Sequence, residues 1–349
     1  MSSKKDKFHN LDKYFMSIAM NLAEGRKGLT GLNPSVGCVL VKNNKILSFG
    51  QTGFKGRPHA EYEAIKKCKK KNLKDSSIYI SMEPCNHYGK TPPCTNLIVK
   101  SKIKKVIYSI NDVDKRTAHK AYSFLKKKKI YVSKGLLNVE AKNIYKNYFK
   151  HKKIKKPYVV AKLACSNDYF ISSKSKFITN YHSRNVSHLL RYKFDSILVS
   201  SKTANLDKSK LSCRIKGLEN FSPQRLIIDK NLKIKNKSPI INDDNKRKTI
   251  IFHSSIDKKK INHLKSKGIK LIYIDLDDYN NINLHKVFLK AYSIGIGSII
   301  VEGGKRLTKS LLRDKLINEF YLFKSNKNLG KLGKNNISDL KKKLTYFLR

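Results

Sequence analysis

The sequence is poor in acidic residues and cysteine, contains no tryptophan, and has no long apolar run. Only 25 Asp and Glu stand against 76 Lys and Arg, which gives a formal net charge of +51. No apolar segment approaches the roughly 20 residues that a membrane helix needs. Six cysteines, irregularly spaced over 349 residues, exclude a disulfide scaffold. We therefore expect a cytoplasmic protein with no membrane partner.

An apolar segment near the N-terminus, residues 14–25, follows several lysines as a signal sequence would. Three polar residues interrupt it: Ser17, Asn21 and Glu24. Its apolar residues recur at helical spacing, which is typical of an amphipathic helix and not of a signal peptide.

The positive charge has two interpretations. It could mark a nucleic-acid-binding surface. However, lysine outnumbers arginine about six to one and is spread over nearly every segment. Dedicated nucleic-acid surfaces cluster their basic residues, use arginine and interleave aromatic side chains. The pattern favours compositional drift, with no specific nucleic-acid partner.

The chain is long enough for two domains with separate cores. Up to about residue 150, helical and strand-like segments alternate, with a hairpin predicted around Asn43 and Asn44 and a helix over 59–70. This pattern predicts a three-layer α/β/α domain. The basic, proline-ended segment 150–157 is the predicted linker, and a second alternating α/β series follows it. We predict domains over residues 1–155 and 156–349.

Two segments carry metal-site chemistry: "PHAEYEAIKKC" (58–68) and "SMEPCNHYGKTPPC" (81–94). His59, Cys85 and Cys94 would give Zn²⁺ three ligands and leave the fourth position for water, as in catalytic zinc sites. Glu61 would then move protons between that water and a departing amine. Zinc nucleobase deaminases have the signature H-x-E followed by P-C-x-x-C. Here the second cysteine follows the first by nine positions instead of three.

Two other interpretations of these residues remain open. They could be an ordinary helical histidine and free loop thiols. Alternatively, His87 could complete a closed structural zinc site, which would leave Glu61 without a role.

Pro92 and Pro93 suit the first turn of a helix. The helix dipole should then lower the pKa of Cys94.

Three motifs, "NPSVGCV", "PHAEYEAI" and "EPCNHYGKTPPC", resemble the deaminase half of the bifunctional riboflavin-biosynthesis deaminase/reductase family. The resemblance covers nearly all of residues 8–150. It implies a cytidine-deaminase-like fold, Zn²⁺ on His59, Cys85 and Cys94, and Glu61 as proton shuttle. Asn33 would contact the substrate, a phosphoribosyl-pyrimidine, through its amide.

The second half resembles the reductase of the same family, which has a dihydrofolate-reductase-like fold and uses NADPH. The resemblance lies in "AKLACSND", with Lys162 and Asp168, in "SKFIT", in the segment 183–214, and in "IIVEGGKRLTKSLL". The implied substrate contacts are Ser175, Arg191, Leu211, Arg214 and Glu302. The implied NADPH contacts are Ala164, Phe177, Thr203, Asp207, Gly304, Lys305, Arg306 and Leu307. A homo-oligomer is also expected.

The last of these motifs has a physical basis of its own. Gly303 and Gly304 let backbone amides approach a ligand closely, and the N-terminus of the following helix favours an anion. A Gly-Gly turn between a strand and a helix is nevertheless common, so the motif alone is weak evidence for phosphate binding.

The reductase half departs from the family pattern. The usual Asp-Gly-Arg turn reads Asp168-Tyr169-Phe170, Phe177 stands where the family has Trp, and Asp-Asp-Pro reads Asp207-Lys208-Ser209. The final strand pair is expected to be missing or eroded. Three alternatives to the bifunctional enzyme therefore follow: a deaminase with a degenerate reductase domain, a tRNA or nucleotide deaminase, and a non-enzymatic nucleic-acid-binding protein.

Overall fold

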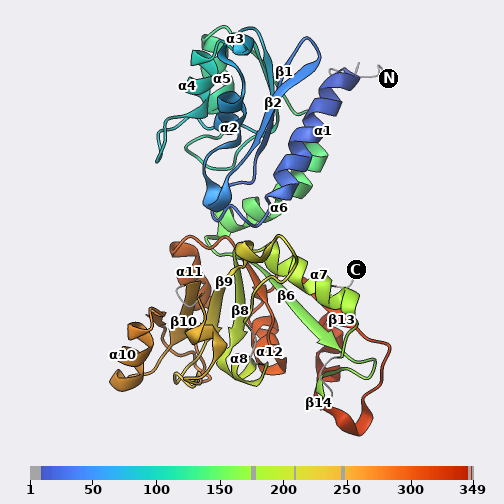
Figure 1. Cartoon of the computed structure of the whole chain (residues 1–349), viewed down its shortest axis with the longest axis vertical. Coiled ribbons are helices and arrows are strands. Elements are labelled where there is room, and N and C mark those ends of the chain that lie inside the picture. Colours follow the sequence, from blue (N-terminus) through green and yellow to red (C-terminus); the bar gives the residue numbers. More distant parts are fainter. Residues whose placement is uncertain (1–8, 174–177, 208–209, 245–247, 345–346, 348–349) are drawn as a thin grey trace. The chain divides into compact units, whose positions relative to one another are not determined.

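A computed structural model describes the chain except residues 1–8, 174–177, 208–209, 245–247, 345–346 and 348–349. The chain divides into two compact units, Met1–Ile154 and Lys155–Arg349. Each unit contains its own sheet and its own buried apolar core (Figure 1). No helix in the described part of the chain is long and apolar enough to cross a membrane.

The first unit is built on a five-stranded sheet with the order β2-β1-β3-β4-β5. Its strands are β1 (Gly37–Lys42), β2 (Lys45–Gln51), β3 (Ser77–Met82), β4 (Lys105–Ile110) and β5 (Tyr131–Lys134). The hairpin prediction is confirmed, because β1 and β2 are antiparallel and Asn43 and Asn44 both have positive φ. Strands β3, β4 and β5 run parallel. Their carboxyl ends therefore meet at one edge, where the site of this unit lies.

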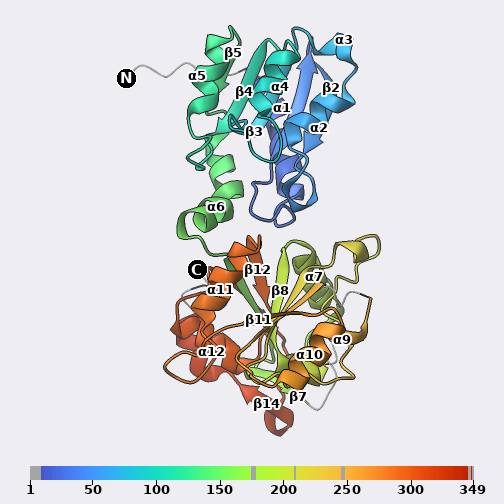
Figure 2. The same ribbon diagram turned by 90° about the vertical axis from the view of Figure 1, so that its left-hand side faces the viewer.

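Helices cover both faces of this sheet, which confirms the predicted three layers. Helices α1 (Asn10–Gly25) and α6 (Asn138–Ile154) pack together on one face. The other face carries α2 (Ala60–Lys67), α4 (Cys94–Lys100) and α5 (Lys120–Lys127), and Figures 1 and 2 show both layers. Alternate residues of β1 and β3 are buried against the two layers, which is why these strands read as continuous apolar runs.

Two local predictions for this unit need correction. The predicted linker starts too early, because residues 150–154 form the end of α6, where Tyr148 and His151 are buried. The helix predicted over 59–70 is interrupted, because Cys68 has ψ 139° and a short helix, α3 (Lys70–Leu73), follows it. Residues 150–154 are helical despite their basic composition, because packing buries this end of α6 at His151.

The second unit is built on a parallel seven-stranded sheet with the order β11-β10-β9-β8-β12-β6-β13. The strands are β6 (Tyr158–Cys165), β8 (Ser196–Ser200), β9 (Gln224–Ile228), β10 (Thr249–His253), β11 (Lys270–Tyr273), β12 (Ser298–Val301) and β13 (Glu319–Lys324). Side chains alternate between two cores: Ile300 points into one, and Ile299 and Val301 into the other. Both faces of the sheet are therefore covered.

The helices of this unit pack on the two faces. They are α7 (Tyr181–Tyr192), α8 (Ser201–Asp207), α9 (Pro239–Asn242), α10 (Lys258–Ser266), α11 (Leu284–Ser293), α12 (Lys305–Arg313) and α13 (Lys341–Leu344). Apolar residues of α11 and α12 bury one face, and those of α9 and α10 bury the other.

One further strand follows β13 within the described residues. Strand β14 (Gly333–Asn336) pairs with β7 (Phe170–Ser173) in a separate two-stranded sheet and does not join the main sheet. Asp168, the first residue of the altered turn, accepts hydrogen bonds from the backbone N–H groups of Leu329 and Gly330. The turn at Asp168 is thus hydrogen-bonded to the segment that follows β13.

Candidate active sites and metal centre

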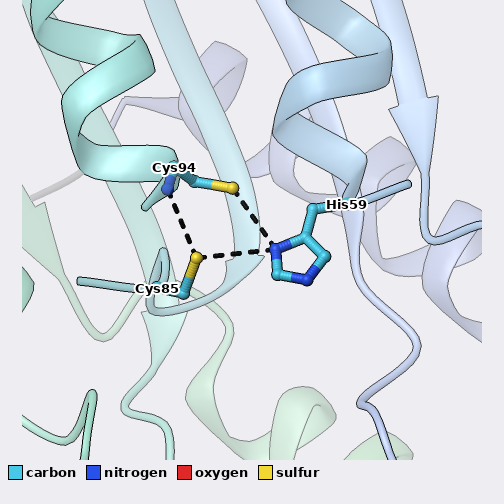
Figure 3. Close-up of side chains that lie close together, drawn as sticks. All are labelled: His59, Cys85 and Cys94. Atoms are coloured by element: carbon cyan, nitrogen blue, oxygen red, sulfur yellow. Dashed lines mark hydrogen bonds between the residues drawn. The ribbon is translucent and has the colours of Figure 1, made fainter. Parts of the chain in front are cut away.

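Three side chains converge at the carboxyl edge of the first unit's sheet (Figure 3). His59 immediately precedes α2, Cys85 follows β3, and Cys94 is the first residue of α4. Nδ1 of His59 lies 3.5 Å from Sγ of Cys85 and 3.4 Å from Sγ of Cys94. Within the described residues, no other His, Cys, Asp or Glu side chains form such a group of three.

These distances fit a tetrahedral zinc ion. Zn–S and Zn–N bonds of about 2.3 Å and 2.0–2.1 Å at a tetrahedral angle separate S and N by roughly 3.6 Å. His87 does not join the group, because its Nδ1 lies 2.8 Å from Oγ1 of Thr117. The arrangement therefore supplies three ligands, as a catalytic zinc site requires. It gives no support to the closed structural site.

Glu61 lies on the first turn of α2, two residues after His59, and is only 3% exposed. Its burial, followed by the negative charge of Cys85, raises the pKa of this carboxyl to about 7. A carboxyl that titrates near neutrality can both take up and release a proton, which is what a proton shuttle does.

The pKa values of the two cysteines shift in opposite directions, which corrects one sequence prediction. The hydrogen bond from Cys94 lowers the pKa of Cys85 to about 4. The same interaction, reinforced by burial and by Glu61, raises the pKa of Cys94 instead of lowering it. The neighbouring thiolate outweighs the dipole of the short helix, since an adjacent full charge interacts more strongly than a partial one.

Glu83, which follows β3 and precedes Pro84, anchors the segment after β4 next to His59, Cys85 and Cys94. Its two carboxylate oxygens accept hydrogen bonds from the backbone N–H groups of Asp112, His119 and Ala121, at 3.2, 3.0 and 3.1 Å. Glu83 therefore ties the loop after β4 to the strand that carries Cys85. Its position in "EPC" was visible in the sequence, but its partners lie about 30 to 40 residues away.

The long loop between the two cysteines is braced along its length. Nη1 of Arg57 donates to Oγ1 of Thr91 at 2.6 Å, and Oγ1 of Thr95 donates to Asn86 at 2.7 Å. With the contact between His87 and Thr117, these bonds connect the loop to the segments before α2 and after β4. The wide cysteine spacing thus accommodates a structured loop.

Asn33 is near this region, and its side-chain amide already has a partner. Nδ2 donates to the carbonyl of Gly56 at 3.0 Å. Gly56 has φ +86°, and a Cβ there would lie 2.5 Å from the Asn33 amide nitrogen. Only glycine allows this close approach. The amide group is therefore held in one orientation, with its oxygen left for other interactions.

In the second unit, the predicted cofactor and substrate residues gather at the carboxyl ends of three neighbouring strands. Ala164 lies near the end of β6, Thr203 follows β8, and Glu302 and Gly304 follow β12. A Cβ on Gly304 would lie 3.8 Å from Oγ1 of Thr203. Ligands of parallel α/β sheets bind at this edge. Gly304 also caps α12, whose first N–H groups face an anion-accepting position.

Arg191 and Glu302 form a bidentate ion pair at this edge of the sheet. Nε and Nη2 of Arg191 donate to the two carboxylate oxygens at 2.7 and 2.8 Å, and Nη1 donates to the carbonyl of Ser212 at 3.1 Å. Although burial opposes it, Arg191 lowers the pKa of Glu302 to about 2. Burial lowers the pKa of the nearby Lys162.

The remaining predicted contacts divide into four groups. Leu211 and Leu307 have side chains in the apolar core, so only their backbone could meet a ligand. Lys305 pairs with Asp339 at 2.8 Å, and Nη2 of Arg306 donates to Asn281 at 2.8 Å. Asp207 ends α8 and is exposed. Ser175 and Phe177 lie outside the described residues.

One residue of this site escaped sequence reasoning. His188 lies on α7, where Nε of Arg214 donates to its Nε2 at 3.2 Å. Its only sequence signal was its place three residues before Arg191 on one helical face.

Comparisons with known families agree with the two units. Residues 9–110 match the family described as the cytidine and deoxycytidylate deaminase zinc-binding region. Residues 157–346 match the RibD C-terminal domain.

Similar proteins cover almost the whole chain. The riboflavin biosynthesis protein RibD of Aquifex aeolicus is 32% identical over 92% of this chain and 88% of its own length. RibD of Bacillus amyloliquefaciens is 31% identical over 90% and 84%. Among solved structures, a Thermotoga maritima diaminohydroxyphosphoribosylaminopyrimidine deaminase/5-amino-6-(5-phosphoribosylamino)uracil reductase is 28% identical, with a TM-score of 0.78 and coverage of 95% and 93%. A structure of Acinetobacter baumannii RibD gives a TM-score of 0.80 at 25% identity, covering 93% and 89%.

Proposed function

Because the chain belongs to the RibD family of riboflavin biosynthesis proteins, we propose that it catalyses two successive reactions. The first is hydrolytic deamination of 2,5-diamino-6-(5-phosphoribosylamino)pyrimidin-4(3H)-one. The second is reduction of the ribosyl group of 5-amino-6-(5-phosphoribosylamino)uracil to a ribityl group. The observation that carries the proposal is the convergence of His59, Cys85 and Cys94 beside a buried glutamate.

In the deamination, His59, Cys85 and Cys94 would hold zinc. When bound, zinc supplies a Lewis acid that lowers the pKa of a coordinated water towards neutrality. Glu61 accepts the proton that the attacking water loses and delivers it to the leaving nitrogen, so that the C–N bond breaks and ammonia departs. Glu83 keeps the loop after β4 in place, and Asn33 offers its amide oxygen to the pyrimidine.

In the reduction, the residues at the carboxyl ends of β6, β8 and β12 would bind NADPH and the deaminated product. NADPH, when bound, supplies the hydride. The start of α12 fits the cofactor's phosphates, since its free N–H groups and helix dipole favour an anion. Arg214 is exposed and offers its guanidinium to the substrate phosphate. Glu302, held ionised by Arg191, faces the ribosyl group.

The proposal extends to the domain limits, with the deaminase in residues 1–155 and the reductase in residues 156–349. The homo-oligomer and the cytoplasmic location stay predictions. A tRNA deaminase is disfavoured by the long, braced loop between the cysteines and by the match over the whole second unit. Failure of the purified chain to deaminate tRNA would dispose of that alternative.

The deaminase proposal is tested by Glu61→Gln, which keeps the shape of the side chain but cannot carry a proton. We expect deamination to fall by about 10²–10⁴-fold with zinc content unchanged. Glu63→Gln, at a partly exposed position of the same helix, is the control and should retain activity. If the Glu61→Gln variant deaminated the substrate at the wild-type rate with zinc bound, Glu61 could not be the proton shuttle.

The reductase proposal is tested on the same sample. Oxidation of NADPH is followed after addition of the deaminated intermediate. Turnover is expected at saturating cofactor. Its absence, with deamination intact, would identify a deaminase with a degenerate second domain and would favour the first alternative.

A further inference from the structure

Two side chains on one face of α7 form hydrogen bonds with the segment 211–214 of the second unit. His188 and Arg191 are three residues apart and therefore lie on the same side of the helix. Both side chains reach the same backbone atom: the carbonyl oxygen of Ser212 lies 3.2 Å from Nδ1 of His188 and 3.1 Å from Nη1 of Arg191. The segment that ends in Arg214 is thus fixed by α7.

The two arginines of this region have different capacities for binding a ligand. Arg191 is 9% exposed, and three of its five N–H groups donate to Glu302 and Ser212. Arg214 is exposed, and its bond to His188 uses only the Nε–H, so among the described residues Nη1 and Nη2 form an open fork. A planar fork of this kind suits a phosphate group.

The contact between Arg214 and His188 determines the tautomer of the imidazole. A guanidinium only donates hydrogen bonds, so Nε2 of His188 must accept from Arg214. Nδ1 then carries the proton and donates to Ser212. The charged groups that act on this ring are Arg191, Arg214 and Glu302. Burial and then the two arginines lower the pKa of His188, which agrees with a neutral ring.

We propose that His188 is a positioning residue of the reductase. By accepting a hydrogen bond from Nε of Arg214, it orients the Nη1 and Nη2 groups of Arg214 towards the phosphate of the substrate. The inference rests on the proposed reductase function and on Arg214 as its phosphate contact. An exposed arginine loses rotamer freedom when it binds a ligand, and a side chain already held in the binding orientation loses less. His188 provides that restraint through one acceptor atom.

Substitution kinetics test the proposal on the full chain. His188→Phe keeps an aromatic ring but has no acceptor, and it should raise the KM for the deaminated substrate about tenfold with little change in kcat. His188→Gln can accept from Arg214 and donate to Ser212, so it should restore the KM to within about threefold of wild type. The melting temperature of the second unit, which should match that of the wild type, serves as the folding control. An unchanged KM in His188→Phe would overturn the proposal.

A binding measurement separates this inference from the proposed activity. In chain labelled with ¹⁵N, NMR should find His188 as the neutral Nδ1–H tautomer at pH 7. Ribose 5-phosphate should shift the Arg214 Nε–H signal in wild type and His188→Gln, and bind about tenfold more weakly to His188→Phe. A protonated ring, the Nε2–H tautomer, or equal affinity in all three would overturn the inference. A chain that binds as expected but does not oxidise NADPH would refute only the reductase activity.

Discussion

At the scale of single residues, two buried glutamates close to the metal ligands have different surroundings and therefore different roles. Glu83 accepts three backbone N–H groups, so its hydrogen-bonding capacity is used within the protein. Glu61 is fully buried beside an anionic thiolate, which raises its pKa to about 7. The first is equipped to hold a loop, and the second to exchange a proton.

The ion pair of Arg191 and Glu302 allows a prediction about acid stability. The folded pKa of Glu302 is about 2, below an unfolded value of about 4.3. The pair therefore stabilises the second unit above pH 4.3, and this contribution falls as the pH drops from about 4.3 to 2. We expect Glu302→Gln to lose about 3 kcal/mol of unfolding free energy at pH 7 and less at pH 3.

Urea unfolding at the two pH values measures this effect. The double variant Arg191→Met/Glu302→Met is the matched control, since removing both charges leaves no unpaired buried ion. It should be more stable at pH 7 than Glu302→Gln. Equal losses for Glu302→Gln at pH 7 and pH 3 would show that the pair is not ionised as described.

At the scale of elements, the carboxyl ends of parallel strands bring functional groups together in both units. Strand β3 leads to Glu83 and Cys85, and β4 leads to the loop that Glu83 holds. Strand β12 leads to Glu302 and Gly304. Because parallel strands are buried on both faces, their ends are the positions at which polar side chains can meet a ligand.

The anchoring of the loop after β4 can be tested with Glu83→Leu. The substitution removes three charge-assisted hydrogen bonds, so unit 1 should lose roughly 2–4 kcal/mol of stability. Amide hydrogen exchange should speed up at Asp112, His119 and Ala121, whose N–H groups Glu83 accepts. Glu63→Leu removes a partly exposed carboxylate paired with Lys67 and should cost less than about 1 kcal/mol. Unchanged exchange at the three amides would contradict the anchoring role.

At the scale of the whole molecule, the two units have separate cores and differ in what a metal can do for them. The proposed zinc ligands all belong to Met1–Ile154. A metal bound to the folded state stabilises it by mass action. Chelation should therefore lower the melting temperature of unit 1 by roughly 10 °C and leave that of unit 2 unchanged.

Calorimetry with and without chelator resolves the two transitions. Adding zinc back should restore the first one. Cys85→Ser, which removes one ligand, should make the chain insensitive to the chelator. If chelation shifted both transitions equally, the two units would be coupled and the cores would not act independently.

Most of the fold and part of the site were predictable from the sequence. Short apolar runs predicted the strands, and the two Asn residues predicted the hairpin. The His-x-Glu and Cys motifs predicted that His59, Cys85 and Cys94 come together. The end of α6 was not predictable, because its lysine-rich composition resembles a linker and only packing buries Tyr148 and His151. The difference between Arg191 and Arg214 was also inaccessible, because it depends on partners far along the chain.

The sequence by itself determined which residues are available for chemistry and in which strands and helices they lie, because periodicity and turn propensity are local properties. Only the tertiary structure decided how those residues act. It brought Nδ1 of His59 to within 3.4–3.5 Å of the sulfurs of Cys85 and Cys94, and it paired Arg191 with a glutamate 111 residues away. These outcomes depend on distances between segments remote in the chain, and packing alone sets such distances.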